Sequence, residues 1–221
     1  MANPLQGETS PAGDSWHQLA LPWQVAFEEA WESWKAGSAG VGACIVDTHG
    51  AIVTRDRNRM SDDPGGAPLA GTRMAHAEMN ALAGLGAGDF QGYAIYTTFE
   101  PCVMCASAIR IYRITQVHYA TDDPVWVGLH DAFRQVPAMA RRLPERERLG
   151  GPWGALAHVL HLAWLLQHAP AEVIDDHRTL RSRELALAEE VAGGGQLHAA
   201  DTSTIVDAAD LIWEDLLSLA L

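Results

Sequence analysis

Four side chains near the middle of the chain have the types and spacing of a catalytic zinc site. They lie in the segments His76-x-Glu78 and Pro101-Cys102-x-x-Cys105. One imidazole and two thiolates fill three corners of a tetrahedral zinc site and leave the fourth corner for water, which distinguishes catalytic from structural zinc. Glu78 carries a carboxylate that can accept and return the protons of such a water. These residues therefore predict metal-assisted hydrolytic chemistry.

A Cys-x-x-Cys pair taken alone is ambiguous, because it also occurs in redox proteins and in structural zinc sites. A redox pair does not need a His-x-Glu segment upstream, and a structural site needs a fourth Cys or His at short spacing. The remaining cysteine, Cys44, lies far upstream in an apolar run and is interpreted as a small core residue. We therefore expect one Zn²⁺ per chain, held by His76, Cys102 and Cys105.

The charge balance argues against a nucleic-acid partner. The 221 residues include 15 Lys and Arg against 28 Asp and Glu, for a net charge of −13, and Lys35 is the single lysine. Binding to a phosphate backbone needs clustered cations, because its affinity comes largely from neutralising phosphates. Arginines do cluster locally, at residues 55–59 and 141–148, but the overall balance favours a small substrate.

No run of apolar residues is long enough to span a bilayer, so we expect no membrane partner. The N-terminal segment is rich in Pro, Gly, Ser and Ala and lacks the features of a signal peptide. Three unevenly spaced cysteines do not form a disulfide framework, and thiolate ligands suit a reducing compartment. These observations predict a cytoplasmic protein.

Hydrophobic patterning predicts alternating helices and strands in the first half of the chain. We expect helices over residues 22–36, 75–85 and 101–112, and strands over 41–47, 51–55, 93–98 and 115–120. The last two strands are linked by a helix and should be parallel. The expected fold class is α/β: a three-layer α/β/α sandwich with a mixed central sheet of four or five strands. Residues 172–174 are a candidate for a further short strand.

The later part of the chain reads mainly as helices. We therefore divide the sequence into a flexible N-terminal tail (1–20), a zinc-binding catalytic core (21–150) and a helical C-terminal extension (151–221). The extension is expected to pack on the core or on a dimer partner. His158, His161 and His168 share one expected helix, and without a Cys or carboxylate to complete a second metal site they are interpreted as structural or interfacial.

The core resembles the zinc-dependent cytidine deaminase superfamily, nearest its branch of tRNA adenosine, guanine and cytosine deaminases. The segments that carry the resemblance are residues 41–47, the pair Asn58-Arg59, residues 76–82 and residues 97–109. The resemblance implies a hydrolytic deamination in which Glu78 transfers protons between water, a ring nitrogen and the leaving amine. It also implies that Asn58 binds the base through its amide, and that the backbone N–H of Ala77 faces the base.

Three further residues have two interpretations each. Glu100 either lines the substrate pocket or is a charge at a helix N-terminus. Trp126 and Asp131 follow the fourth expected strand, where they either touch substrate or are a core tryptophan and a helix-capping aspartate. Asn58 itself has the alternative of a turn residue.

The sequence thus predicts a zinc-dependent aminohydrolase that acts on a small nucleobase, nucleoside or related aminated heterocycle, with a guanine-like or cytosine-like substrate favoured. A tRNA adenosine deaminase shares every catalytic residue and is the first alternative. A catalytically silent, zinc-stabilised binding protein is the second, and the intact Glu78 argues against it. A homodimer is expected.

Overall fold

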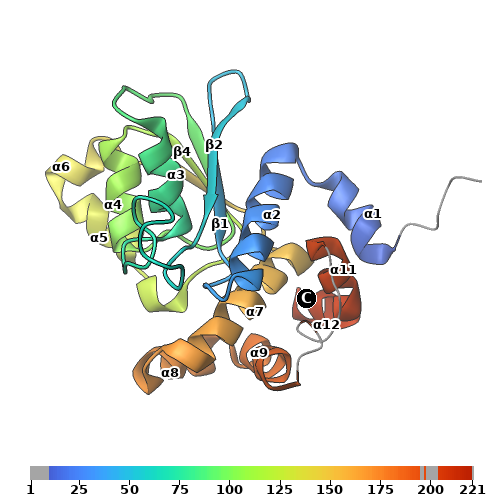
Figure 1. Cartoon of the computed structure of the whole chain (residues 1–221). Helices are drawn as coiled ribbons and strands as arrows, with labels where there is room; N and C mark the ends of the chain where they lie inside the picture. Colours follow the sequence, from blue (N-terminus) through green and yellow to red (C-terminus); the bar gives the residue numbers. More distant parts are fainter. Residues whose placement is uncertain (1–9, 195–196, 198–203, 221) are drawn as a thin grey trace, which may run out of the picture.

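A computed structural model describes residues 10–194, 197 and 204–220, and its centre is a five-stranded sheet with the order β2-β1-β3-β4-β5 (Figure 1). The strands are β1 (Gly42–Val46), β2 (Ile52–Arg57), β3 (Ala94–Thr97), β4 (Gln116–Tyr119) and β5 (Glu145–Arg148). β1 pairs antiparallel with β2 and β3, whereas β3, β4 and β5 are parallel. The expected mixed sheet and the parallel pair are confirmed.

Helices cover both faces of this sheet, which confirms the three-layer fold (Figure 1). On one face, Ile45, Ile95 and Val117 form a core with α3 (Ala77–Leu85) and α4 (Val103–Ile111). On the other face, Tyr96 packs edge-on against Trp23 of α2 (Leu21–Lys35), with ring centroids 5.2 Å apart. Alternate residues of the central strands therefore lie in two separate hydrophobic layers.

The C-terminal helices extend the second layer. They are α7 (Gly151–His168), α8 (Ala171–Leu180), α9 (Ser182–Gly194), α11 (Ile205–Leu211) and α12 (Trp213–Leu219). Trp153 of α7 anchors them, since its ring lies 5.4 Å from Phe27 of α2 and 5.6 Å from Trp213 of α12. Between β4 and β5 run the short elements η1 (Pro124–Trp126), α5 (Leu129–Gln135) and α6 (Pro137–Ala140). Among the described residues, no helix is both long and apolar enough to cross a membrane.

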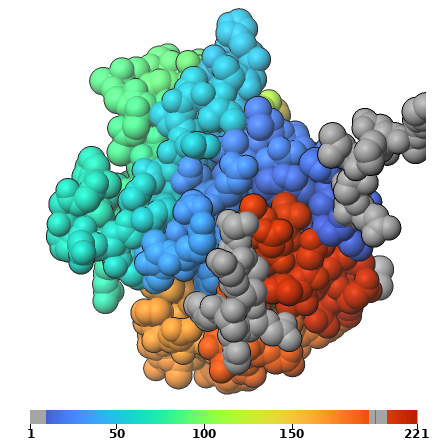
Figure 2. All heavy atoms as spheres, turned by 45° about the vertical axis from the view of Figure 1, so that its right-hand side comes forward, coloured from blue at the N-terminus to red at the C-terminus, as the bar shows by residue number. Residues whose placement is uncertain are grey.

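The N-terminal segment differs from the expected flexible tail over residues 1–20. Residues 1–9 lie outside the described residues, but Pro11–Gln18 form helix α1. Ser10 caps this helix by accepting a hydrogen bond from Gly13 N–H, and Pro11 occupies its first turn, where a missing N–H costs nothing. Trp16 packs on Trp153, with centroids 5.1 Å apart, so α1 lies against the C-terminal helices (Figure 2).

The fifth strand is β5 and does not lie at residues 172–174, which belong to α8. Ile174 and His177, three residues apart on α8, are buried on one face, so helical rather than alternating burial explains the apolar residues there. The hydrophobic patterns do not predict β5, because it is an edge strand of charged residues. Its Arg146 lies over the Tyr119 ring, 4.7 Å from the centroid.

Gly42 allows β1 and α2 to touch backbone to backbone. A Cβ at this position would lie 2.2 Å from the Ala26 carbonyl oxygen and 2.3 Å from the Ala30 nitrogen. Neither backbone atom can move away without shifting the helix. Gly42 also donates its N–H to Thr98 Oγ1 at 3.2 Å, which ties β1 to the end of β3.

We expect Gly42→Ala to lower the free energy of unfolding by about 2 kcal/mol, the usual cost of forcing an extra methyl into a packed interior. Urea unfolding followed by circular dichroism measures this. Gly193→Ala is the matched control, because Gly193 is exposed on α9 and a Cβ there meets nothing within 4 Å. Equal stabilities of the two variants would refute the close contact.

Candidate functional site

The three expected metal ligands converge at the N-termini of two helices. His76 is the residue before α3 and Cys102 the residue before α4, and both have extended backbones, with ψ of 152° and 175°. Cys105 lies in the first turn of α4. His76 Nδ1 is 3.7 Å from Cys102 Sγ and 3.5 Å from Cys105 Sγ. All three ligand atoms lie within 4.8 Å of one another.

These distances fit zinc. With Zn–S and Zn–N bonds of about 2.3 and 2.0 Å at tetrahedral angles, the nitrogen and each sulfur should be about 3.5 Å apart. The observed separations of 3.5 and 3.7 Å agree with this geometry. In the described part of the chain this is the one group of three His, Cys, Asp or Glu side chains placed to hold a metal ion. One imidazole and two thiolates form a zinc site with a fourth position for a small molecule.

The surroundings favour a thiolate at Cys102. A hydrogen bond from the Cys105 thiol, helped by His76, lowers the pKa of Cys102 to about 4. Cys44 is the opposite case: it lies in β1, donates its S–H to the Pro22 carbonyl oxygen at 3.2 Å, and burial raises its pKa to about 12. It is therefore a core thiol, in agreement with the sequence interpretation.

Glu78 lies beside the ligand set even though it is only two residues from His76. Residues two apart on a regular helix do not share a face, but His76 precedes the helix and so escapes this restriction. The Glu78 side chain is 3% exposed. Its Oε1 accepts a hydrogen bond from Thr97 Oγ1 at 3.1 Å, and its Oε2 lies 3.5 Å from Cys105 Sγ. Burial raises the pKa of this carboxyl above the usual glutamate range.

A cavity of about 220 Å³ opens above these residues. Of the residues expected to contact substrate, Asn58, Glu100 and Trp126 line it together with His76, Glu78 and Cys102. Asp131, on α5, lies outside this lining and borders a neighbouring surface hollow, and Ala77 is a fully buried residue of the α3 core.

Two of these residues have defined hydrogen bonds. Asn58 Oδ1 accepts from the Met60 N–H at 3.0 Å, so its NH2 group is the part of the amide that remains to donate to a ligand. Glu100 is paired on both oxygens, with the Arg146 guanidinium and with the Asp123 N–H at 2.9 Å. Glu100 therefore lines the pocket while it also holds the loop that follows β4.

Sequence reasoning missed the residues that close the pocket. They are Asp123 from the loop after β4 and a set from the C-terminal helices, namely His161, Trp164, Leu165, Val173 and His177. His161, Trp164 and Leu165 have the i, i+3, i+4 spacing of one helix face, which was the available signal. Asp123 is 7% exposed, and burial raises its pKa to about 7. The C-terminal extension thus completes the pocket of its own chain.

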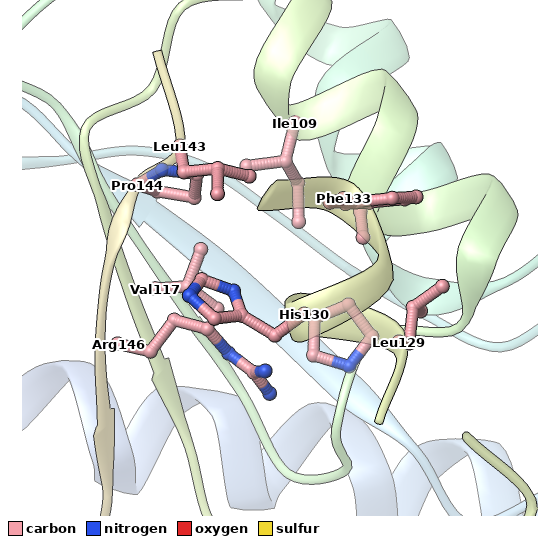
Figure 3. Close-up of a pocket in the computed structure, with 10 residues that line it drawn as sticks. Ile109, Val117, Leu129, His130, Phe133, Leu143, Pro144 and Arg146 are labelled. Carbon is pink, nitrogen blue, oxygen red and sulfur yellow. The ribbon is translucent and has the colours of Figure 1, made fainter. Parts of the chain in front are cut away.

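A second, apolar pocket lies between α4, α5 and the start of β5 (Figure 3). Its wall includes Ile109, Val117 and Phe133, with Arg146 at one side. At about 30 Å³ it has room for a water molecule or two but not for a heterocycle. The cavity above Glu78 is therefore the candidate active site.

Comparison with known proteins agrees with this site. The family model described as the cytidine and deoxycytidylate deaminase zinc-binding region matches residues 15–121. The tRNA-specific adenosine deaminase of Bacillus subtilis (strain 168) is 32% identical over 111 residues, which cover 48% of this chain and 64% of that protein. The guanine deaminase of the same organism is 31% identical over 115 residues, which cover 48% of this chain and 74% of that protein.

A solved structure from work on A-to-I editing by tRNA:A34 deaminases has 27% sequence identity and a TM-score of 0.51. The match covers 62% of this chain and 95% of that structure. The chain spans 64% of the length of the first curated relative above, and residues 122–221 lie beyond the range matched by the family model.

The protein purified with zinc should hold about one zinc ion per chain, since three ligands converge once in the described structure. Cys102→Ser should lose the metal, because it removes a thiolate ligand. Glu78→Gln should retain it, because Glu78 is not a ligand. Elemental analysis after dialysis against a weak chelator measures both, and Cys44→Ser is the control for loss of an unrelated thiol. Zinc retained by Cys102→Ser would exclude this ligand set.

Acid should destabilise the protein through the histidines behind the pocket. Burial lowers the pKa of His161 to about 3 and that of His177 to about 4. Burial also lowers the pKa of His158 well below its ordinary value. Between about pH 6.5 and 4 the unfolded chain binds protons at these residues and the folded chain does not, so stability falls as the pH falls. Removing one such histidine, in His177→Gln, should reduce this slope by about 1 kcal/mol per pH unit. Urea unfolding at pH 7, 6 and 5 tests this, and parallel curves for the two proteins would contradict it.

Proposed function

The chain belongs to the cytidine and deoxycytidylate deaminase family, and we propose that it hydrolytically removes an exocyclic amine from a small, phosphate-free heterocycle. The observation that carries this proposal is the position of Glu78, which lines the candidate active site and is buried beside the His76, Cys102 and Cys105 ligand set. A nucleobase or nucleoside of the guanine or cytosine type fits the proposal best.

The reaction replaces C–NH2 by C=O, consumes one water and releases one ammonia. Zinc, held by His76, Cys102 and Cys105, would lower the pKa of the attacking water. The Glu78 carboxylate accepts a proton from the attacking water, whose oxygen bonds to the ring carbon that bears the amine. Glu78 passes that proton to the adjacent ring nitrogen and then moves a second one to the leaving amine. The hydrogen bond from Thr97 fixes the carboxylate for these transfers.

Charge argues for a substrate without phosphate. The described lining of the pocket contains the carboxyl groups of Glu78, Glu100 and Asp123 and no lysine or arginine. A phosphate entering this pocket would meet these carboxyl groups, and the described lining offers no lysine or arginine to bind it. The volume of about 220 Å³ is below the range of about 300–1,000 Å³ typical of pockets for drug-sized ligands, which suits a single ring system.

The pocket also offers groups that bind a flat, polar ring. The Asn58 NH2 group is available as a donor, and the aromatic side chains of Phe99, Trp126 and Trp164 supply apolar surface. A guanine-like or cytosine-like base has a hydrogen-bond acceptor for the Asn58 NH2 group and two flat faces that can pack against the aromatic side chains.

The second candidate function is deamination of adenosine in tRNA. Its support is the similarity to the Bacillus subtilis tRNA-specific adenosine deaminase and to the solved structure associated with A-to-I editing. The net charge of −13 and the cation-free pocket lining argue against it. Cytoplasmic location and a homodimer stay predictions from the sequence.

Ammonia release from a panel of bases, nucleosides, nucleotides and aminotriazines tests the proposal. We expect turnover of at least one base or nucleoside, and at least tenfold lower kcat/KM for the matching 5′-monophosphate because of the carboxylates. Turnover of tRNA with none of the small molecules would instead establish the second candidate.

Glu78→Gln is the matched variant, since it keeps the shape of the side chain and removes the base. It should lower kcat by about 10²–10⁴-fold or more, the usual contribution of a general acid–base group, while the melting temperature and zinc content stay unchanged. Near-normal turnover by this variant would remove Glu78 from the mechanism.

A further inference from the structure

Two ring nitrogens on the C-terminal helices are buried at the candidate active site without a hydrogen-bond partner. They are Nδ1 of His161 on α7 and Nε2 of His177 on α8, and both residues line the pocket. The His177 side chain is fully buried. Buried polar atoms in proteins almost always have a partner, so two unpaired nitrogens in side chains of the pocket lining call for a partner that the structure does not contain.

Both imidazoles are held in place. The His161 ring packs on Phe99, with centroids 4.2 Å apart, and Trp164 one turn later donates its indole N–H to the Gly37 carbonyl oxygen at 3.1 Å. Arg181, the residue after α8, pairs with Asp122 at 3.4 Å, which ties the end of that helix to the loop after β4. These contacts hold α7 and α8 at the pocket, so both histidines stay in its lining.

His177 ends a chain of hydrogen bonds that begins at the sheet. Thr121 Oγ1 lies 3.2 Å from His158 Nδ1, and His158 Nε2 lies 3.1 Å from His177 Nδ1. If the Thr121 hydroxyl donates to His158 Nδ1, His158 Nε2–H donates to His177 Nδ1, and the hydrogen of His177 is on Nε2. If that hydroxyl accepts, both tautomers reverse and His177 presents a bare Nε2. The chain can thus offer either a donor or an acceptor.

The rings work as neutral groups. Burial, reinforced by the other histidines, lowers the pKa of His158 and His161 well below neutrality, and burial likewise lowers that of His177 to about 4. A neutral imidazole has one donor and one acceptor nitrogen, so this wall recognises polar edges and not charge.

We infer that His161 and His177 are specificity-determining residues that together bind an amide-like edge of the substrate, where a hydrogen-bond donor lies beside an acceptor. This inference rests on the proposed deaminase function and adds to it that the second half of the chain selects the substrate. A ring with the reacting amine but without such an edge would leave these two nitrogens unpaired and would bind less well.

Matched pairs of heterocycles separate this role from a structural one. Cytosine has an amide-like edge that 4-aminopyrimidine lacks, and guanine has one that 2-aminopurine lacks. Binding is measured by calorimetry to zinc-loaded protein that carries Glu78→Gln, so that no turnover intervenes. We expect the amide-bearing member of at least one pair to bind at least tenfold more tightly.

The preference should depend on the two histidines. His161→Phe and His177→Phe should each weaken binding of the amide-bearing base roughly 10- to 100-fold and leave its partner within about threefold. His177→Gln, which keeps a polar group in place, should restore most of the preference. His168→Phe is the control, because His168 is an exposed histidine on the same helix outside the pocket lining. Zinc content and melting temperature are compared for all variants, and His161→Phe decides the question if His177→Phe does not fold.

Two results overturn the inference. One is an unchanged preference in folded, zinc-loaded His161→Phe and His177→Phe; the other is that neither amide-bearing base binds. Ammonia release by the wild-type protein distinguishes the causes. If it deaminates any heterocycle of the panel, the inference alone fails; if it deaminates none, the proposed function fails as well.

Discussion

The convergence of two helix N-termini on three ligand atoms is the constraint on which the rest of the structure depends. His76 Nδ1 and the sulfurs of Cys102 and Cys105 lie within 4.8 Å of one another, although they come from segments separated by a strand. This requires α3 and α4 to begin at the same edge of the sheet, and the core they share with Ile95 and Val117 fixes both helices there. The free N–H groups and the positive helix ends favour thiolate at that point. The packing of α3 and α4 on the sheet therefore also positions the metal ligands.

Electrostatics then divides the pocket into two parts. One part of its lining contains the ligands His76 and Cys102 with the carboxyl groups of Glu78, Glu100 and Asp123, and burial raises the pKa of Asp123 to about 7. The other part, from α7 and α8, contributes neutral imidazoles and apolar side chains. Because no lysine or arginine lies in the described lining, recognition there must come from hydrogen bonds and ring contacts. Substrate selection by phosphate charge would need a different surface.

The catalytic half of the site could be predicted from the sequence because its chemistry depends on residue types at short spacing. His76, Glu78, Cys102 and Cys105 were identified in this way, and strands β1 to β4 followed from their apolar patterns. β5 could not be found because its charged residues are held by pairing with β4 and by contacts such as Arg146 with Glu100. Helix α1 forms where a flexible tail was expected, because Trp16 packs on Trp153, which lies far along the chain. His161 and His177 share a pocket only because α7 and α8 fold back over the ligand site, and nothing in their spacing indicates which cavity they face.

Residues 122–221, which the family model does not match, are positioned by close contacts with the residues that it does match. A Cβ at Gly154 would lie 2.6 Å from the Ala120 carbonyl oxygen, and one at Gly40 would lie 2.8 Å from Leu160 Cβ, so α7 lies directly on the end of β4 and on the turn before β1. A helix held at two such points cannot slide without losing both contacts, and His161 lies one residue beyond Leu160. The same contacts that stabilise the second core layer thus determine where His161 lies in the pocket lining. The first half of the sequence thus supplies the metal ligands, Glu78 and Asn58, the second half adds His161 and His177 to the same pocket lining, and close packing joins the two.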